Sequence, residues 1–386
     1  MVVAMNDGPA TLDIWHTTLP MRTFEHAAAT RQATEAIVVR LRTPDGHVGW
    51  GETLPRPYVT GETLESVPAD IREIFWPRLR ACRDRREFQA ALAELPCRDG
   101  DRVVTAARCA VELAATDALN LWPPSPIETS PTRRPPLAPA RVSGVIGSAD
   151  PKRTARSLRR MRLYGLKHFK LKLGFDQDVD RANLDAVTKQ LARNLRAGKC
   201  SLRVDANGAW PYGEVPGRID ELKARGVLAV EQPCRAGAGR LAELASKCSL
   251  PLIADESCLT ELDAEVLLGA EGRVWLNLRL AKNGGLGPTL AIARQAARDE
   301  VPWVLGCMVG ESSILSTAQR ALLAAGPPPA MLEGNYGKFL LKDDLAAPSL
   351  RFGYGGRVVT TPGGRFSPPV LPEKITRYGR WIATLD

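Results

Sequence analysis

The chain has 386 residues, of which 44% are hydrophobic and 25% charged. This is the composition of a globular protein with one large and one smaller domain, and it excludes collagen, small disulfide-stapled proteins and mostly disordered chains. Lys and Arg outnumber Asp and Glu by 52 to 43, a net charge of +9. Because these basic residues are spread along the chain without a recognition motif, we expect attraction for small anions and no nucleic-acid partner.

The sequence predicts neither a membrane span nor a secretory signal, and its cysteines show no metal-binding spacing. No apolar run approaches the roughly 20 residues that cross a bilayer, and the first residues lack the basic and apolar regions of a secretory signal. We therefore predict no membrane association and a cytoplasmic location. The eight cysteines form no C-x-x-C pair and no zinc-finger spacing, so we expect reduced, mostly buried thiols.

The first part of the chain predicts an α+β domain over residues 1–122. Residues 11–50 alternate between apolar and polar side chains around a Pro-Asp-Gly turn at 44–46, which indicates a hairpin. Residues 64–121 show helical periodicity instead. The Pro-rich stretch 123–139 is unsuited to a helix interior or a central strand, so it predicts a linker.

Eight short apolar segments then alternate with helix-sized gaps. They predict strands near 140–147, 168–174, 201–206, 227–232, 251–256, 273–280, 302–309 and 330–333. The spacing is close to the roughly 31 residues per unit of a TIM barrel, which favours a barrel domain over 140–349. A doubly wound sheet is the alternative, but no G-x-G-x-x-G follows the first strand. Residues 350–386 return to strand-like character, and we expect them to pack back on the first domain.

Three acidic residues end consecutive predicted strands: Asp205, Glu231 and Asp255, which are 26 and 24 residues apart. In a barrel this spacing places them side by side on the catalytic face. Three converging carboxylates repel one another unless a cation neutralises them, and an all-oxygen set without His or Cys favours Mg²⁺. The alternative, that each acid merely caps a helix, requires the same coincidence in three successive units.

Lys170 and Lys172 lie one strand earlier and point to the same face of that strand. In a barrel strand this face is the interior, where two ammonium groups are costly unless they serve a function. A lysine beside other cations can have a lowered pKa and act as a base near neutral pH. An exposed edge strand with solvated lysines is the alternative.

Several motifs in this order resemble the enolase superfamily, in its muconate lactonizing enzyme subgroup. They are FKLKLG at 169–174, RVDANGAW at 203–210, VEQP at 230–233, IADES at 253–257, LNLRLAKNGG at 276–285 and GCMVGES at 306–312, with GHVGWGET at 46–53 and VTGET at 59–63 in the first domain. The resemblance implies α/β architecture: a modified (β/α)7β TIM barrel with an α+β N-terminal capping domain.

The resemblance also implies a bound metal ion and a reaction that begins with proton abstraction. One Mg²⁺ would be held by Asp205, Glu231 and Asp255, and a proton α to a carboxylate would be abstracted to give an enolate that the metal stabilises. Lys172 would be the base, and Lys170 would support the negative charge near the substrate carboxylate. The mandelate racemase branch uses a His–Asp dyad late in the barrel, but no histidine follows His168 here, which disfavours that branch.

The sixth strand departs from the family pattern. The family has a motif resembling Asn-Ile-Lys, with its lysine opposite the first base, whereas this chain has Arg279 at that position. Arginine is a poor acid–base group but a strong clamp for carboxylates and enolates. A single-base reaction with Lys172, cycloisomerisation or elimination, therefore fits best. Lys282 is a candidate to supply the missing group from a shifted loop.

The resemblance places substrate contacts in the capping domain and at the ends of the barrel strands. The candidates are Phe24, Asn207, Met308, Glu311, Glu333 and Tyr336, with Arg22, His26 and residues 60–63 as further loop positions. Dipeptide epimerases of the subgroup carry paired aspartates near the eighth strand to hold an ammonium group. This chain has Leu-Glu-Gly-Asn at 332–335 instead, which weakens the case for a dipeptide substrate.

The leading hypothesis is a Mg²⁺-dependent cycloisomerase or lyase acting on a small-molecule carboxylate, with Lys172 as base and Arg279 as clamp. One alternative is an epimerase or racemase of dipeptides or N-acyl amino acids. Another is a family member that binds a carboxylate without catalysis. The resemblance also leads us to expect a homo-oligomer.

Overall fold

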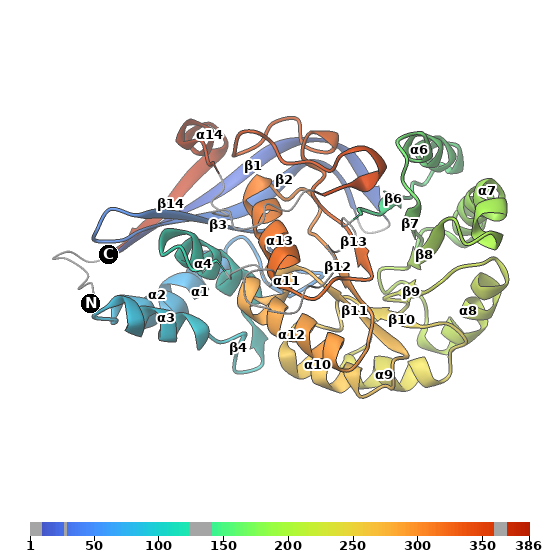
Figure 1. Cartoon of the computed structure of the whole chain (residues 1–386), viewed down its shortest axis with the longest axis horizontal. Coiled ribbons are helices and arrows are strands. Elements are labelled where there is room, and N and C mark those ends of the chain that lie inside the picture. The colour runs from blue at the N-terminus through green and yellow to red at the C-terminus, as the bar shows by residue number, and fades with distance from the viewer. Residues whose placement is uncertain (1–9, 27–28, 123–140, 359–368) are drawn as a thin grey trace, which may run out of the picture.

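The structure is a computed structural model that describes residues 10–26, 29–122, 141–358 and 369–386. The predicted linker at 123–139 lies outside the described residues. Two sheets organise the molecule (Figure 1): an antiparallel sheet in the order β14-β1-β2-β3 and a parallel sheet in the order β13 to β6. No helix among the described residues is long and apolar enough to cross a membrane.

The antiparallel sheet and a set of helices form the capping part of the molecule. Its strands are β1 (Thr11–His26), β2 (Ala29–Arg42), β3 (Val48–Thr53) and β14 (Gly379–Leu385), with a short ribbon of β4 (Arg98–Asp99) and β5 (Arg102–Val103). Its helices are α1 (Ser66–Asp70), the π-helical turn η1 (Ile71–Phe75), α2 (Trp76–Arg80), α3 (Arg85–Ala93) and α4 (Thr105–Ala118). The predicted hairpin is confirmed by antiparallel pairing of β2 with β3.

Close approach between β3 and α4 explains two glycines in the first domain. A Cβ atom at Gly51 would lie 1.9 Å from the carbonyl oxygen of Ala110, and one at Gly49 would lie 2.1 Å from the backbone nitrogen of Ala118. All residues of α4 are buried. The last strand, β14, pairs antiparallel with β1, so the end of the chain completes the sheet.

The parallel sheet forms the barrel. Its strands are β6 (Gly144–Ile146), β7 (His168–Lys172), β8 (Ser201–Asp205), β9 (Val230–Glu231), β10 (Leu252–Ala254), β11 (Val274–Leu278), β12 (Trp303–Leu305) and β13 (Met331–Leu332). The connecting helices are α6 (Pro151–Leu163), α7 (Gln177–Arg196), α8 (Val215–Ala224), α9 (Ala238–Ser246), α10 (Glu261–Leu268), α11 (Leu280–Asn283), α12 (Leu286–Arg298) and α13 (Ser313–Ala325). The short helical turns are η2 (Tyr212–Glu214), η3 (Gly337–Phe339) and η4 (Tyr354–Gly356), and α14 (Pro372–Tyr378) precedes β14.

The two edges of this sheet meet. A parallel bridge joins Val142 to Leu332, and the Ser143 N–H donates to the Leu332 carbonyl at 2.7 Å. In the part of the chain that the structure describes, β13 is followed by the turns η3 and η4 and by α14, which precedes β14, and by no barrel helix. The domain is therefore a modified (β/α)7β barrel, and the predicted fold class is confirmed. The eight predicted strands are all present, each shorter than its apolar segment.

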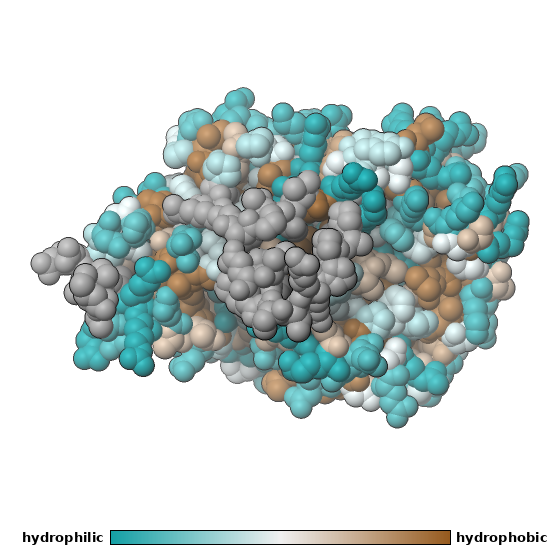
Figure 2. All heavy atoms as spheres, in the orientation of Figure 1, coloured by the Kyte–Doolittle hydropathy of each residue, from teal (hydrophilic) through white to brown (hydrophobic). Residues whose placement is uncertain are grey.

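Apolar side chains fill the space between the strands and their helices, and polar ones cover the outside. Leu171, Val204 and Leu276 are among the fully buried core residues of the barrel. Figure 2 shows hydrophilic side chains over much of the face that it presents, with smaller hydrophobic areas between them. The eight cysteines are free thiols, of which four are buried and four partly exposed.

Two buried carboxylates of the capping part bind the N-termini of barrel helices. Glu52, on β3, accepts hydrogen bonds from the Ser312 N–H at 3.1 Å and the Ser312 hydroxyl at 2.6 Å, at the start of α13. Glu112, on α4, accepts from the N–H groups of Leu286 and Gly287 at 2.9 and 2.8 Å, at the start of α12. Burial raises the pKa of Glu52 to about 7. The free N–H groups of a helix start favour such acceptors, so these contacts join the two parts.

Candidate active site

The carboxyl ends of neighbouring strands bring the predicted residues together. Lys172 lies in register with Asp205, and Asp205 with Glu231, across β7, β8 and β9. Asp255 comes directly after β10. The three carboxylates are fully buried. Successive βα units therefore place these side chains at one end of the barrel, where active sites of this fold lie.

Lys170 lies two residues earlier on β7 and contacts three acids of the same cluster. Its Nζ is 3.0 Å from Glu231 Oε1, 2.9 Å from Glu333 Oε2 and 3.5 Å from Asp205 Oδ2. Burial acts to lower the pKa of Lys170, but these carboxylates hold it above its ordinary value. The side chain is thus a fixed positive charge beside the acids.

Glu333, a predicted substrate contact, is engaged by two cations. Besides Lys170, it accepts a hydrogen bond from Arg203 of β8. Burial acts to raise the pKa of Glu333, but these two cations bring it to about 2. Sequence reasoning missed Arg203, although its position two residues before Asp205 on the same strand marks it as facing the interior.

Lys172 is held by two polar partners. Its Nζ lies 3.2 Å from Asp205 Oδ2 and 3.0 Å from Asn207 Oδ1. Asn207 has a left-handed backbone, with φ of 47°, and its N–H donates to Asp205 Oδ1 at 2.9 Å. We predicted Asn207 as a substrate contact, but the structure places its side chain against Lys172 and outside the set of cavity-lining residues. Ion pairs with Lys172 and Lys170 outweigh the effect of burial and hold the pKa of Asp205 well below its usual range.

Arg279 reaches from the end of β11 into the acids. Its Nη2 donates to Asp255 Oδ2 and lies 3.7 Å from Glu231 Oε1, while Nη1 is 3.7 Å from the sulfur of Met308. The Arg279 N–H donates to Asn283 Oδ1 at 2.8 Å, which fixes the backbone at this point. The guanidinium therefore lies where the carboxylates converge.

Lys282 takes a different position from the one that a second acid–base group would need. It is fully buried, and its Nζ donates to the backbone carbonyls of Asp255 at 2.6 Å and Asn277 at 2.7 Å. Burial lowers the pKa of Lys282 to about 8. Its side chain is not part of the cavity wall, so the sequence-based suggestion that it replaces the family lysine there is not supported by its placement.

Asp205, Glu231 and Asp255 have the chemistry of Mg²⁺ ligands. The set is all oxygen and buried. Neither Glu231 Oε2 nor Asp255 Oδ1 has a hydrogen-bond partner among the described residues, although Asp255 Oδ1 lies 3.2 Å from Lys282 Nζ. In the described chain no three His, Cys, Asp or Glu side chains are already arranged around a metal position; Lys170, Lys172 and Arg279 pair with the acids instead. The donors fit a hard divalent cation once Arg279 withdraws from Asp255.

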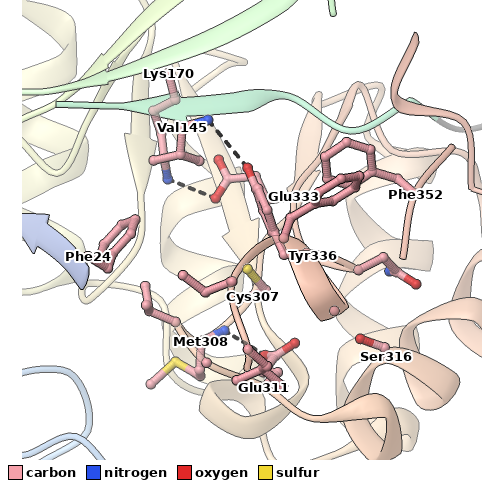
Figure 3. Close-up of a pocket in the computed structure, with 18 of the residues that line it drawn as sticks. Phe24, Val145, Lys170, Cys307, Met308, Glu311, Ser316, Glu333, Tyr336 and Phe352 are labelled. Atoms are coloured by element: carbon pink, nitrogen blue, oxygen red, sulfur yellow. Dashed lines mark hydrogen bonds and ion pairs between the residues drawn. The ribbon is translucent and has the colours of Figure 1, made fainter. Parts of the chain in front are cut away.

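A cavity of about 500 Å³ opens beside Lys170, Lys172 and Arg279. Figure 3 shows part of its lining, including Lys170. The predicted contacts that line it are Phe24, Met308, Glu311, Glu333 and Tyr336, and the wall also includes Met161, Tyr164, Cys307, Phe339 and Phe352. Arg22 and residues 60–63 do not line it, and the side chain of His26 lies outside the described part of the chain. Glu62 instead accepts hydrogen bonds from the Ala106 and Ala107 N–H groups at the start of α4.

Glu311 is the other acid in the cavity wall. Its Oε1 accepts a hydrogen bond from the Met308 N–H at 2.5 Å, and its Oε2 accepts one from Gln319 Nε2 at 3.1 Å. Burial raises the pKa of Glu311 to about 8. The Tyr336 hydroxyl is also engaged, because it donates to the Ser143 carbonyl at 2.9 Å.

Comparisons with known proteins point to one family. Residues 153–364 match the family described as Enolase C-terminal domain-like. An L-Ala-D/L-amino acid epimerase of Maribacter sp. (strain HTCC2170) is 30% identical, over 92% of this chain and 96% of the relative. The muconate lactonizing enzyme from Pseudomonas fluorescens, solved with muconolactone, has a TM-score of 0.80 at 25% identity, covering 97% of this chain and 100% of that one.

A third protein, similar in fold, was solved with a metal. The dipeptide epimerase from Cytophaga hutchinsonii, complexed with Mg and the dipeptide D-Ala-L-Val, has a TM-score of 0.82 at 17% identity and covers 98% of this chain and 100% of that one. The motifs, the barrel with its capping domain and these matches lead to one conclusion. The chain belongs to the enolase superfamily of enzymes, in the group of mandelate racemase and muconate lactonizing enzyme.

Proposed function

We propose that this protein is a Mg²⁺-dependent epimerase or racemase that removes the proton α to the carboxylate of an acylated amino acid or dipeptide. The observation that carries the proposal is the position of Lys172, which lines the cavity while its amine lies 3.2 Å from Asp205 at the end of the next strand. An L-Ala-D/L-amino acid epimerase among the relatives supports epimerisation over our leading sequence-based hypothesis, cycloisomerisation or elimination.

Asp205, Glu231 and Asp255 are the proposed ligands of Mg²⁺. When bound, the ion would neutralise the negative charge that develops on the substrate carboxylate as the α-proton leaves. The expected acidity of such a proton is very low, so this charge must be balanced within the site.

Residues of the chain itself supply the base, a fixed positive charge and the group that binds the substrate carboxylate. Lys172, in its neutral form, accepts the α-proton at Nζ, and Asn207 Oδ1 at 3.0 Å orients that amine. Lys170 stays protonated between Glu231 and Glu333 and provides fixed positive charge. Arg279, which lines the cavity, binds the substrate carboxylate through its planar donors.

Arg279 favours a second candidate, the single-base reaction of a cycloisomerase or lyase. Inversion of configuration needs a proton donor on the face opposite Lys172, and a guanidinium is a poor one. The lysines in the described cavity wall are Lys170 and Lys172, which come from the same strand. A reaction in which Lys172 both removes and returns the proton needs no second donor.

Proton NMR in D₂O with Mg²⁺ distinguishes these functions. The enantiomers of N-acyl amino acids, dipeptides and cis,cis-muconate are incubated with the native protein and with Lys172→Ala. Deuterium at the α-carbon with inverted configuration, lost in Lys172→Ala, is the expected result. Deuterium with retained configuration, or a new lactone or alkene signal, would instead establish the single-base candidate. Binding of these carboxylates without exchange would identify a non-catalytic member of the family.

A further inference from the structure

A group of aromatic rings lines the cavity beside aliphatic side chains such as Leu166, Val309 and Leu341. Five rings line it: Phe24, Tyr164, Tyr336, Phe339 and Phe352. Figure 3 labels three of them, Phe24, Tyr336 and Phe352. The centroids of Phe339 and Phe352 are 4.9 Å apart, and Tyr336 meets Phe352 edge to face at 5.3 Å. Tyr164 packs edge-on against Phe339 at 5.4 Å, so these four rings support one another. A preformed aromatic wall of this kind suits an apolar, flat group.

The charged side chains that line the cavity disfavour a substrate that carries a positive charge. Four of the described lining residues are cationic: Arg160, Lys170, Lys172 and Arg279. The acids are Glu311 and Glu333. Glu333 is already paired with Lys170 and Arg203, and Glu311 accepts hydrogen bonds from the Met308 N–H and Gln319. A substrate ammonium would therefore lose its hydration without gaining a free carboxylate partner.

We infer that the substrate is a carboxylate whose amino group is acylated and carries no positive charge, and whose side chain is apolar and aromatic. This inference rests on the proposed function and names the substrate of that site. Lys170 and Arg279 mark the end that receives the carboxylate, and the rings receive the body of the molecule. A cavity of about 500 Å³ has room for an acylated aromatic amino acid. A dipeptide with a free ammonium group is disfavoured.

Two matched pairs of compounds test this inference with the native protein and Mg²⁺. N-isobutyryl-L-Phe and L-Ala-L-Phe differ only by a methyl group in place of the ammonium. N-isobutyryl-L-Phe and N-isobutyryl-L-Glu differ only in the side chain. We expect kcat/KM for exchange at the carbon next to the carboxylate to be at least about tenfold higher for N-isobutyryl-L-Phe in both pairs, since an unpaired buried polar group discriminates strongly.

Failure of the inference and failure of the proposed function give different results. Equal or faster exchange of L-Ala-L-Phe would overturn the inference and leave the proposed function standing. Without exchange of any compound, binding measured by calorimetry decides: preference for N-isobutyryl-L-Phe would support the inference and overturn the proposed chemistry, and no preference would overturn both.

A pair of variants tests the aromatic wall separately. Phe339 lines the cavity and is 37% exposed, whereas Tyr354, which is 69% exposed, packs against Tyr164 without lining the cavity. Phe339→Ala is expected to weaken binding of N-isobutyryl-L-Phe about threefold to tenfold, on the scale of one aromatic contact. Tyr354→Ala serves as the control and is expected to leave it unchanged. Equal effects of the two variants would overturn the assignment of the rings to the substrate side chain.

Discussion

Arg279 is expected to compete with Mg²⁺ for the acids at the end of the barrel. Its guanidinium donates to Asp255 Oδ2 and lies 3.7 Å from Glu231 Oε1. Both carboxylates are buried and are among the proposed metal ligands. The ion can therefore bind only after the contact between Arg279 and Asp255 is broken, and the substrate-free protein should bind Mg²⁺ more weakly than these acids would allow on their own.

The size of this effect follows from the contact that is lost. A hydrogen bond between charged groups contributes about 1.5–3 kcal/mol, and each 1.4 kcal/mol changes an equilibrium constant tenfold. Arg279→Met should therefore tighten binding of Mg²⁺ or Mn²⁺ to the substrate-free protein about 10- to 100-fold. Titration calorimetry measures the affinity directly, without any turnover.

A matched variant separates competition at the acids from the general charge of the cavity. Arg160→Met removes the same charge from the cavity wall, but none of the described ion pairs joins Arg160 to the three acids, so it should change the affinity by much less. Thermal unfolding adds a second readout, because Arg279→Met leaves Asp255 without this partner and Mg²⁺ should raise its Tm more than that of the native protein. Unchanged or weaker metal affinity in a folded Arg279→Met variant would refute this reasoning.

Three further predictions concern the base, the joint between the two parts and the packing of α4. Lys172→Gln should lower the rate of α-proton exchange by about 100-fold or more, measured by NMR, and a normal rate would exclude Lys172 as the base. Burial raises the pKa of Glu52 from 4.5 to about 7, so the folded protein keeps a proton that the unfolded chain releases, and stability should fall by about 3 kcal/mol as pH rises from 4.5 to 7. Denaturant unfolding of Glu52→Gln should lack this part of the pH dependence, and an identical dependence would contradict the assignment. Gly51→Ala should destabilise the protein by about 1–3 kcal/mol or more, because its Cβ would meet the Ala110 carbonyl; an unchanged denaturation midpoint would show that β3 and α4 can separate at little cost.

The strands and the acids could be predicted because their signals are local. Short apolar segments at regular spacing indicate a barrel, and the alternation of Lys170 and Lys172 places both inside it. Since strands of a barrel are equivalent, acids at the same point of successive units must meet. The antiparallel hairpin at the start of the chain followed equally from its turn and its alternation.

Contacts between distant segments could not be predicted in the same way. Arg203 and Glu333 are 130 residues apart and meet only because the barrel closes. Glu112 and Leu286 are 174 residues apart and meet because the capping part packs on the barrel. The sequence identified Arg279 as unusual, but whether its side chain turns toward the acids or toward the cavity depends on the charges around it, which only the folded arrangement supplies.

The charged groups and much of the aromatic wall of the cavity come from different segments of the chain. Most of the charged groups stand on β7 to β9 or directly after β10 and β11, and Glu333 directly follows β13. Much of the aromatic wall comes instead from Phe24 on β1 and from residues 336–352. A mutation in these outer segments alters the shape of the space without moving the amine of Lys172, the proposed base. Selection for new substrates, in nature or in a laboratory library, can therefore act on the wall alone, and the number of tolerated substitutions should be far higher there than among the charged groups.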